Sequence, residues 1–368
     1  MSLPPSIASV LDRCPSASSG ILEKRLLFAT SRAEKDLFLS AVDLPENKPG
    51  EVAVAWCFQD GHEEVFFEKL TSFRPHAIVT GWSTSSLLRT WLETPDCPTR
   101  YICHLAGSVR NLVPRRFLEK GGHVTNWGTL AGETVAEHAL LLALAALRNM
   151  TRWPELARNS ITDAPPPFNN PVIRLQTQSL FRRRVGIHGF GAVARALIRL
   201  LRAFETEISV FSAGVPESLI CQQGARPVGN LKELLRSNDV IFECESLTPL
   251  TERAITAEHL ALIPSGGTFV NIGRARVVDE EALIAEARSQ RIRVAVDVIE
   301  DEPLRPSSPW MQIKGAILSP HIGGPSADCY PQFGKFAMAN IHRFLASDEH
   351  AVPAFEARVT EAIYDRST

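Results

Sequence analysis

The chain has 368 residues, a net charge of −2, 45% hydrophobic residues and 22% charged residues, the composition of an ordinary globular protein. At 40.5 kDa it is too long for one ordinary core, so two domains are expected. The near-zero net charge provides no basic footprint for nucleic acid. Seven cysteines without a CxxC pair argue against a disulfide framework or a zinc site, and favour a reducing compartment such as the cytoplasm.

Two segments could in principle direct the chain to a membrane or out of the cell, and neither has the required pattern. The N-terminus, MSLPPSIASVLDRCPSASSG, lacks a positive region followed by an apolar core, so no secretory signal is expected. The most apolar segment, AEHALLLALAAL at 136–147, is too short to cross a bilayer. It predicts a helix over about 134–148 that is buried in the protein.

In the first part of the chain, short apolar runs alternate with segments that could be helical. This alternation predicts an α/β layer with a parallel sheet. The expected strands are RLLFAT (25–30), VAVAWCF (52–58), HAIVTGW (76–82), YICHLAG (101–107) and HVTNW (123–127).

The segment DAPPPFNNPV at 163–172 separates this part from a second alternation. Its prolines and asparagines exclude a helix or a central strand, so a loop is expected. Six strands interleaved with helices then predict a doubly wound sheet. These strands are RVGIHG (184–189), EISVFSA (207–213), DVIFECE (239–245), GTFVNIG (267–273), RVAVDVI (293–299) and AILSPHI (316–322).

A glycine loop, GFGAVA, follows the first strand of the second alternation and opens a helical run. Gly189 permits a tight turn, Gly191 lets the backbone approach a pyrophosphate, and Ala194 lets the helix pack closely on the strand. The free N–H groups at the start of that helix would face the anion. Alone the motif is a weak signal, but its place between a strand and a helix favours dinucleotide binding.

The cofactor can be NAD or NADP on this evidence. In NAD-binding sheets the second strand ends with an acid that holds the ribose 2′-hydroxyl. Here that position is Ser212 and not an acid. No arginine stands nearby to hold a 2′-phosphate either. The missing acidic barrier favours NADP slightly.

Later segments carry a more specific pattern: TVAEHALLLALAALR, LTPLTERAI, NIGRARVVDEEAL, VAVDVIEDEPL and ILSPHIGG. Together they resemble the D-isomer-specific 2-hydroxyacid dehydrogenase family over roughly residues 102–324. The resemblance implies two Rossmann-like α/β domains with doubly wound parallel sheets. The cofactor domain, 131–321, would be inserted into a flavodoxin-like substrate domain made of 1–130 and 322–368.

The resemblance also implies the catalytic residues. Arg274 in NIGRA matches the family's substrate-binding arginine, His321 in SPHIGG its catalytic histidine, and Glu302 in EDEP the acid that pairs with that histidine. Two positions depart from the family pattern. Ala275 stands where a glycine is usual, and His188 replaces the aliphatic residue before the first glycine.

These residue types suit the reduction of a 2-keto acid. A guanidinium binds a carboxylate bidentately and polarises the keto oxygen. A histidine, with an ordinary pKa of about 6.5, exchanges the proton, and a neighbouring acid orients it. The resemblance further implies a carboxylate-binding loop at Gly107 and Ser108, and a second pocket wall in TGWSTSS (80–86). The cofactor-binding residues would be Gly189, Gly191, Ala192, Val193, Ser212, Ser246, Thr251, Ile272, Asp297 (for the nicotinamide carboxamide) and Gly323.

The leading hypothesis is an NAD(P)-dependent oxidoreductase that reduces a small 2-keto acid, of the glyoxylate or hydroxypyruvate type, to the D-2-hydroxy acid. The alternative is an NAD(H)-binding redox sensor or corepressor-like module with little turnover. Formate dehydrogenases are disfavoured, because that family has an amide where Glu302 stands. His138 and His259 are expected to be structural. A homodimer is expected from the family, with no metal, membrane or nucleic-acid partner.

Overall fold

The computed structural model describes residues 23–59, 63–158, 170–347 and 354–366. The N-terminal lead-in and most of the predicted 163–172 loop lie outside these ranges. The end of that loop corrects the prediction, because Pro171–Arg174 forms a short helix, α8, capped by the Asn170 side chain. Proline is tolerated in the first helical position, where its missing N–H would have no partner. The chain divides into two compact units, residues 1–130 with 327–368, and residues 131–326.

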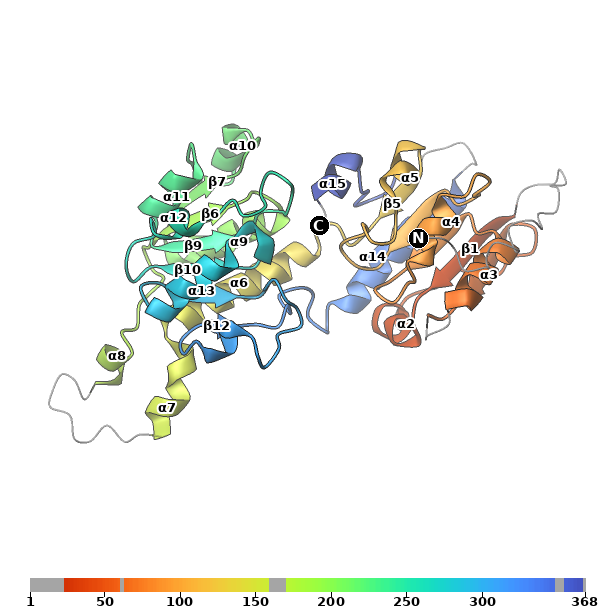
Figure 1. Cartoon of the computed structure of the whole chain (residues 1–368). Coiled ribbons are helices and arrows are strands. Elements are labelled where there is room, and N and C mark those ends of the chain that lie inside the picture. Colours follow the sequence, from red (N-terminus) through yellow and green to blue (C-terminus); the bar gives the residue numbers. More distant parts are fainter. Residues whose placement is uncertain (1–22, 60–62, 159–169, 348–353, 367–368) are drawn as a thin grey trace. The chain divides into compact units, whose positions relative to one another are not determined.

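The first unit is built on a five-stranded parallel sheet of order β2-β1-β3-β4-β5, the flavodoxin-like order. All five predicted strands are present (Figure 1). Each strand ends one to three residues before the predicted run does, and the remaining residues form loops at the carboxyl edge of the sheet. The strands are β1 (Lys24–Ala29), β2 (Val52–Trp56), β3 (Ala77–Thr80), β4 (Tyr101–His104) and β5 (His123–Thr125).

The C-terminal segment of the chain belongs to this first unit. Its long helix, α14, lies against α2, where a Cβ on Gly334 would be 1.7 Å from the carbonyl oxygen of Phe38. The same helix accepts a hydrogen bond from Cys103 on β4 at the Ala337 carbonyl. The helices are α2 (Arg32–Leu39), α3 (Glu63–Phe73), α4 (Leu87–Leu92), α5 (Arg115–Glu119), α14 (Tyr330–Ala346) and α15 (Glu361–Arg366).

The second unit holds a seven-stranded parallel sheet of order β12-β11-β10-β9-β6-β7-β8. From β6 the chain first adds β7 and β8 on one side and then adds β9 to β12 on the other side. The strand order therefore switches between β6 and β9, and ligands are expected at the carboxyl ends of these strands. The strand β8 was not predicted, because two residues carry no period. The last predicted strand is much shorter than expected, since Pro320 interrupts it. The strands are β6 (Arg184–His188), β7 (Glu207–Phe211), β8 (Arg226–Pro227), β9 (Val240–Glu243), β10 (Thr268–Asn271), β11 (Arg293–Val296) and β12 (Ile317–Leu318).

Helices cover both faces of this sheet because neighbouring strand residues point to opposite sides. Val240 and Phe242 belong to one apolar cluster, with α6 and α9, whereas Ile241 belongs to the other, with α11, α12 and α13. The doubly wound α/β fold is therefore confirmed. The helices are α6 (Ala131–Leu147), α7 (Trp153–Arg158), α9 (Ala192–Leu201), α10 (Glu217–Gln222), α11 (Leu231–Ser237), α12 (Ala257–Leu260) and α13 (Glu280–Ser289), with 3-10 turns at Met150–Arg152, Arg202–Phe204, Ala275–Val277 and Pro309–Gln312.

The apolar helix α6 buries one face in its own unit, whereas Leu141 on the same helix is 53% exposed. It packs on α9, where a Cβ on Gly132 would be 3.0 Å from the Cβ of Ala192. Within the described residues, no helix combines the length and apolarity that a membrane span requires.

Candidate active site

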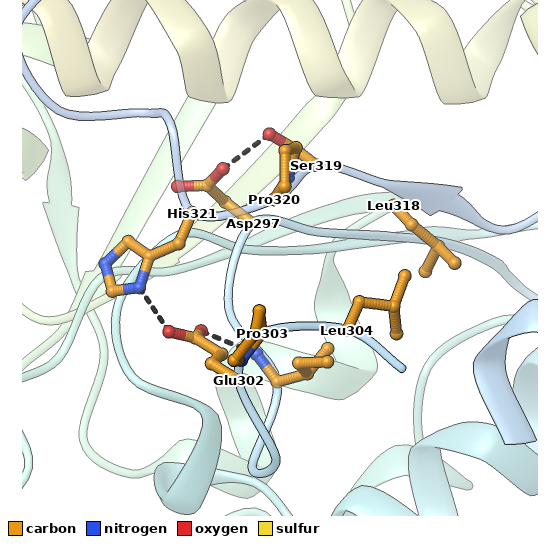
Figure 2. A pocket seen from close by; sticks show the side chains of 9 residues that line it. Asp297, Glu302, Pro303, Leu304, Leu318, Ser319, Pro320 and His321 are labelled. Carbon is orange, nitrogen blue, oxygen red and sulfur yellow. Dashed lines mark hydrogen bonds and ion pairs between the residues drawn. The ribbon is translucent and has the colours of Figure 1, made fainter. Parts of the chain in front are cut away.

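The predicted catalytic residues all lie in loops at the carboxyl ends of β10, β11 and β12. Asp297 directly follows β11, Glu302 lies five residues further on, and His321 follows β12. Together with Leu304 and Leu318 they line a cavity of about 350 Å³ (Figure 2). Because neighbouring parallel strands end at the same edge, residues far apart in the sequence meet there.

His321 and Glu302 form a hydrogen-bonded pair. The His321 Nδ1 atom lies 2.7 Å from Glu302 Oε2, and Figure 2 shows the imidazole pointing toward this carboxylate. The other carboxylate oxygen accepts the Ile299 backbone N–H at 3.2 Å, which fixes the acid in place. His321 itself has a φ of 55°, a left-handed conformation that non-glycine residues seldom adopt. With Nδ1 engaged, Nε2 is the nitrogen available for a ligand, and 51% of the side chain is exposed.

Asp297 anchors the loop that carries His321. Its carboxylate accepts the Ser319 hydroxyl at 2.5 Å and the backbone N–H groups of Ile322 and Gly323 at 3.0 and 2.9 Å. The His138 Nε2 atom lies 3.3 Å away. Burial favours a raised pKa for Asp297, but these donors outweigh it and lower the pKa to about 2. The acid is thus held ionised at the centre of a network of hydrogen-bond donors.

Gly323 is packed against this network. A Cβ there would be 2.7 Å from Asp297 Oδ2 and 3.0 Å from the His138 ring, so only glycine lets the loop come so close. His138 was expected to be structural, and the structure gives it a part in positioning Asp297 and Ser319, whose hydroxyl lies 2.9 Å from its Nε2. The Nδ1 atom of His259 lies 3.0 Å from the Thr256 hydroxyl oxygen, and these two residues form the capping box of α12.

Arg274 stands at the end of the loop that follows β10. Asn271 holds this loop by accepting the Gly273 N–H at 3.1 Å, and the Arg274 Nη1 group donates to the Gly273 carbonyl at 2.9 Å. Burial lowers the pKa of Arg274 overall, and the charge of Glu302 partly opposes this shift. Ala275 begins a 3-10 turn, a right-handed conformation that alanine adopts without strain.

The glycine loop between β6 and α9 has the geometry that a dinucleotide needs. Gly189 has a φ of 95°, and a Cβ there would be 2.8 Å from the Glu245 nitrogen. Gly191 is the N-cap of α9, and no side chain of the described residues caps that helix end. Space is open where a Cβ on Gly191 would project. Backbone N–H groups without a side-chain cap, at a helix N-terminus with open space before it, fit a pyrophosphate.

The other predicted cofactor residues lie at the start of α9 and in the loops after β9 and β10. Ala192 and Val193 form the first turn of α9, and Ile272 is buried beside β9, its N–H bonded to the Glu243 carbonyl at 3.2 Å. Thr251 ties down the loop after β9 through a 2.6 Å bond to the Ser246 carbonyl. Among the described residues, no group of three side chains could hold a metal ion.

Sequence reasoning gave no role to His188 and missed two acids near it, Glu243 and Glu245. His188, at the end of β6, lies with its Nδ1 atom 2.5 Å from Glu243 Oε2, at the end of β9, and both are buried. Burial favours a lowered pKa for His188, but Glu243 raises it overall. Glu245 accepts a 3.0 Å hydrogen bond from the Ser212 hydroxyl after β7. The run ECE was visible in the sequence, but it was included in a predicted strand and not examined for charge.

In the first unit, the predicted substrate loop is shaped by Trp127. A Cβ on Gly107 would be 2.8 Å from the Trp127 ring, and the Gly107 carbonyl accepts the Asn126 amide at 2.6 Å. Ser108 is exposed. The predicted second wall at 80–86 is held by buried Glu34, which accepts the Ser83 N–H at 3.0 Å.

Comparison with known proteins places this chain among dehydrogenases. A family model described as the NAD-binding domain of D-isomer specific 2-hydroxyacid dehydrogenases matches residues 140–323. A glyoxylate reductase from Pyrococcus furiosus is 27% identical over 248 residues, covering 67% of this chain and 72% of that protein. A D-3-phosphoglycerate dehydrogenase from Methanocaldococcus jannaschii is 26% identical over 241 residues, covering 65% of this chain but only 44% of its own length.

Solved structures agree on the fold. The apo form of D-mandelate dehydrogenase from Rhodotorula graminis superposes with a TM-score of 0.71 at 22% identity, covering 91% of this chain and 99% of that one. A glyoxylate reductase from Paecilomyes thermophila gives 0.67 at 23% identity, covering 90% and 98%.

Proposed function

Because the chain belongs to the D-isomer specific 2-hydroxyacid dehydrogenase family, we propose that it transfers a hydride between NAD(P)H and a small 2-keto acid of the glyoxylate or hydroxypyruvate type, giving the D-2-hydroxy acid. The observation that carries the proposal is the His321–Glu302 pair at 2.7 Å, at the carboxyl edge of a dinucleotide-binding sheet. Glyoxylate reductases among the matched relatives support the substrate size.

The glycine loop and Asp297 would hold the cofactor, which supplies or accepts the hydride when bound. In the reducing direction, His321 donates a proton from Nε2 to the oxygen that develops negative charge at the former keto carbon. Glu302 bonds to Nδ1, so it fixes the orientation of the imidazole and leaves the proton transfer to Nε2. In the oxidising direction His321 takes the proton from the hydroxyl group.

Arg274 is proposed to bind the substrate carboxylate and polarise the keto oxygen. The backbone N–H groups of Gly107 and Ser108 in the first unit are proposed as donors to a substrate carboxylate, as the family resemblance implies. Asp297 already accepts bonds that position the His321 loop. Its Oδ2 atom accepts the Gly323 N–H at 2.9 Å, and a carboxylate oxygen has a second acceptor site that we propose for the nicotinamide carboxamide. A homodimer is part of the proposal as a family property.

The test is turnover of a panel of 2-keto acids with NADH and with NADPH, followed by absorbance. The variant His321→Ala should lower kcat by about 10²- to 10⁴-fold while nucleotide fluorescence shows unchanged cofactor binding. His342→Ala, an exposed histidine on α14, serves as the matched control and should keep full activity. Tight NADH binding without turnover of any acid would favour the redox-sensor alternative instead.

A further inference from the structure

The carboxylate of Glu245 stands at the place where the adenosine ribose of a dinucleotide is expected. In this sheet the ribose site lies beyond the carboxyl end of β7, which is where Ser212 lies. The Ser212 hydroxyl donates to Glu245 Oε2 at 3.0 Å. The acid that is absent from the end of β7 is therefore supplied from the loop after β9.

Glu245 can reach this place because Gly189 has no side chain. The strand β6 lies between β7 and β9, so a contact from the β9 loop to Ser212 has to pass over the end of β6. A Cβ on Gly189 would be 2.8 Å from the Glu245 nitrogen and 2.9 Å from the Cys244 carbonyl carbon. The absence of a side chain at Gly189 therefore allows the loop after β9 to lie close to the end of β6.

A buried pair holds the backbone of Glu245 in position. Glu243 Oε1 accepts the Glu245 N–H at 2.7 Å, and Glu243 Oε2 lies 2.5 Å from His188 Nδ1. Counted over the whole residue, the exposed fraction is 4% for His188 and 0% for Glu243. His188, which replaces an aliphatic residue, compensates the buried charge of Glu243, and the two together act as positioning residues for Glu245.

The carboxylate of Glu245 retains capacity for a ligand. Oε2 accepts the Ser212 hydroxyl, and Oε1 accepts the Ser246 N–H at 2.8 Å. Each carboxylate oxygen has about two acceptor sites, so one site on each remains for the neighbouring hydroxyls of a ribose. A 2′-phosphate in the same place would bring its own negative charge against this carboxylate.

The arginine on the adjacent strand is engaged elsewhere. Arg226 on β8 donates to the Ser209 hydroxyl at 3.1 Å, three residues before Ser212 in the chain, and lies 3.5 Å from Glu233. The charged side chain that the fold brings to Ser212 is an acid and not a base.

We propose that Glu245 determines the cofactor specificity of this protein by binding the ribose 2′-hydroxyl, so that the protein uses NAD(H) in preference to NADP(H). This inference rests on the proposed dehydrogenase function. It reverses the slight preference for NADP drawn from the sequence, because that reasoning looked for the acid only on the strand that ends at Ser212.

The test is nucleotide binding, measured by the fluorescence of the reduced nicotinamide and independent of turnover. The wild-type protein should bind NADH about 10- to 100-fold more tightly than both 2′-deoxy-NADH and NADPH, the range for a hydrogen bond to a charged group. Glu245→Ala should lose most of the difference between NADH and 2′-deoxy-NADH, and Glu245→Gln should bind NADPH more tightly than the wild type does.

Glu207→Gln is the matched control, since it makes the same charge change at the exposed opposite end of β7 and should keep the wild-type ratios. The inference is overturned if the wild type binds NADPH as tightly as NADH, or if Glu245→Ala keeps the wild-type ratio. Failure to bind either nucleotide would overturn the dehydrogenase proposal as well, whereas turnover with NADPH alone would overturn only the role of Glu245.

Discussion

At the scale of single residues, the second unit holds two histidine–glutamate pairs in different environments. His321 and Glu302 are partly exposed, with 51% and 35% of their side chains accessible. His188 and Glu243 have 5% and 0% of theirs accessible. An exposed pair contributes little to stability, so the His321–Glu302 pair is best understood through its chemistry. A buried pair cannot lose one member cheaply, because the other is left charged without a partner.

This difference predicts a strong coupling between His188 and Glu243. Each single change, His188→Val or Glu243→Val, should lower the free energy of unfolding by about 3–5 kcal/mol. The double variant should lose at least about 2 kcal/mol less than the sum of the single losses, because no buried charge is left unpaired. Urea titrations of the four proteins measure the coupling. Additive losses would mean that the two side chains do not stabilise one another.

The coupling between His188 and Glu243 should also depend on pH. Although burial opposes it, Glu243 raises the pKa of His188 above its ordinary 6.5. The stabilisation is therefore complete below pH 6.5 and is lost as the pH rises through the raised value. The coupling free energy should be larger at pH 6 than at pH 9.

At the scale of secondary-structure elements, two glycines allow two segments to pack unusually closely on their neighbours. In the second unit Gly189 admits the β9 loop, and in the first unit Gly334 brings α14 against the Phe38 carbonyl of α2. Because α14 comes from residues 330–346 and α2 from residues 32–39, this contact joins segments that lie far apart in the sequence.

The contact predicts that Gly334→Ala destabilises the first unit. Alanine should gain about 1 kcal/mol of helix propensity, but its Cβ would stand 1.7 Å from a backbone oxygen. The clash should win, with a net loss of about 1–3 kcal/mol, measured by thermal unfolding. Gln332→Ala, exposed on the same helix, should change stability by no more than about 0.5 kcal/mol. A Gly334→Ala protein as stable as the wild type would rule out this packing.

At the scale of the whole molecule, each unit has its own apolar core. Two clusters, one on each face of the seven-stranded sheet, are composed entirely of residues between 131 and 326. The first unit instead draws Val359 and Tyr364 from the C-terminal segment into its core. A unit with a self-contained core can in principle fold alone.

The fragment 131–326 should therefore fold and bind NADH as the full chain does, without reducing 2-keto acids, because the proposed carboxylate-binding loop at Gly107 is missing. Circular dichroism and nucleotide fluorescence measure both properties. The fragment 1–130 is the comparison, and it should fail to unfold cooperatively since it lacks α14. If 131–326 were unfolded, the division of the chain would not correspond to independent folding units.

The sequence by itself predicted the two parallel sheets and the glycine loop, and its resemblance to the family implied the roles that we propose for Arg274, Glu302 and His321. Local patterns carry this information, because a buried strand needs a run of apolar residues and a tight turn before a helix needs glycine. The order and spacing of the motifs were enough to identify the family.

Only the tertiary structure decided which side chains meet at the edge of a sheet. His188 and Glu243 are 55 residues apart, and Ser212 and Glu245 are 33 apart. The donors of Asp297 come from a helix and from a loop after another strand. No local period relates such residues, because they are brought together by the order of the strands and by the close approach that a glycine permits. The proposed choice of cofactor depends on that approach.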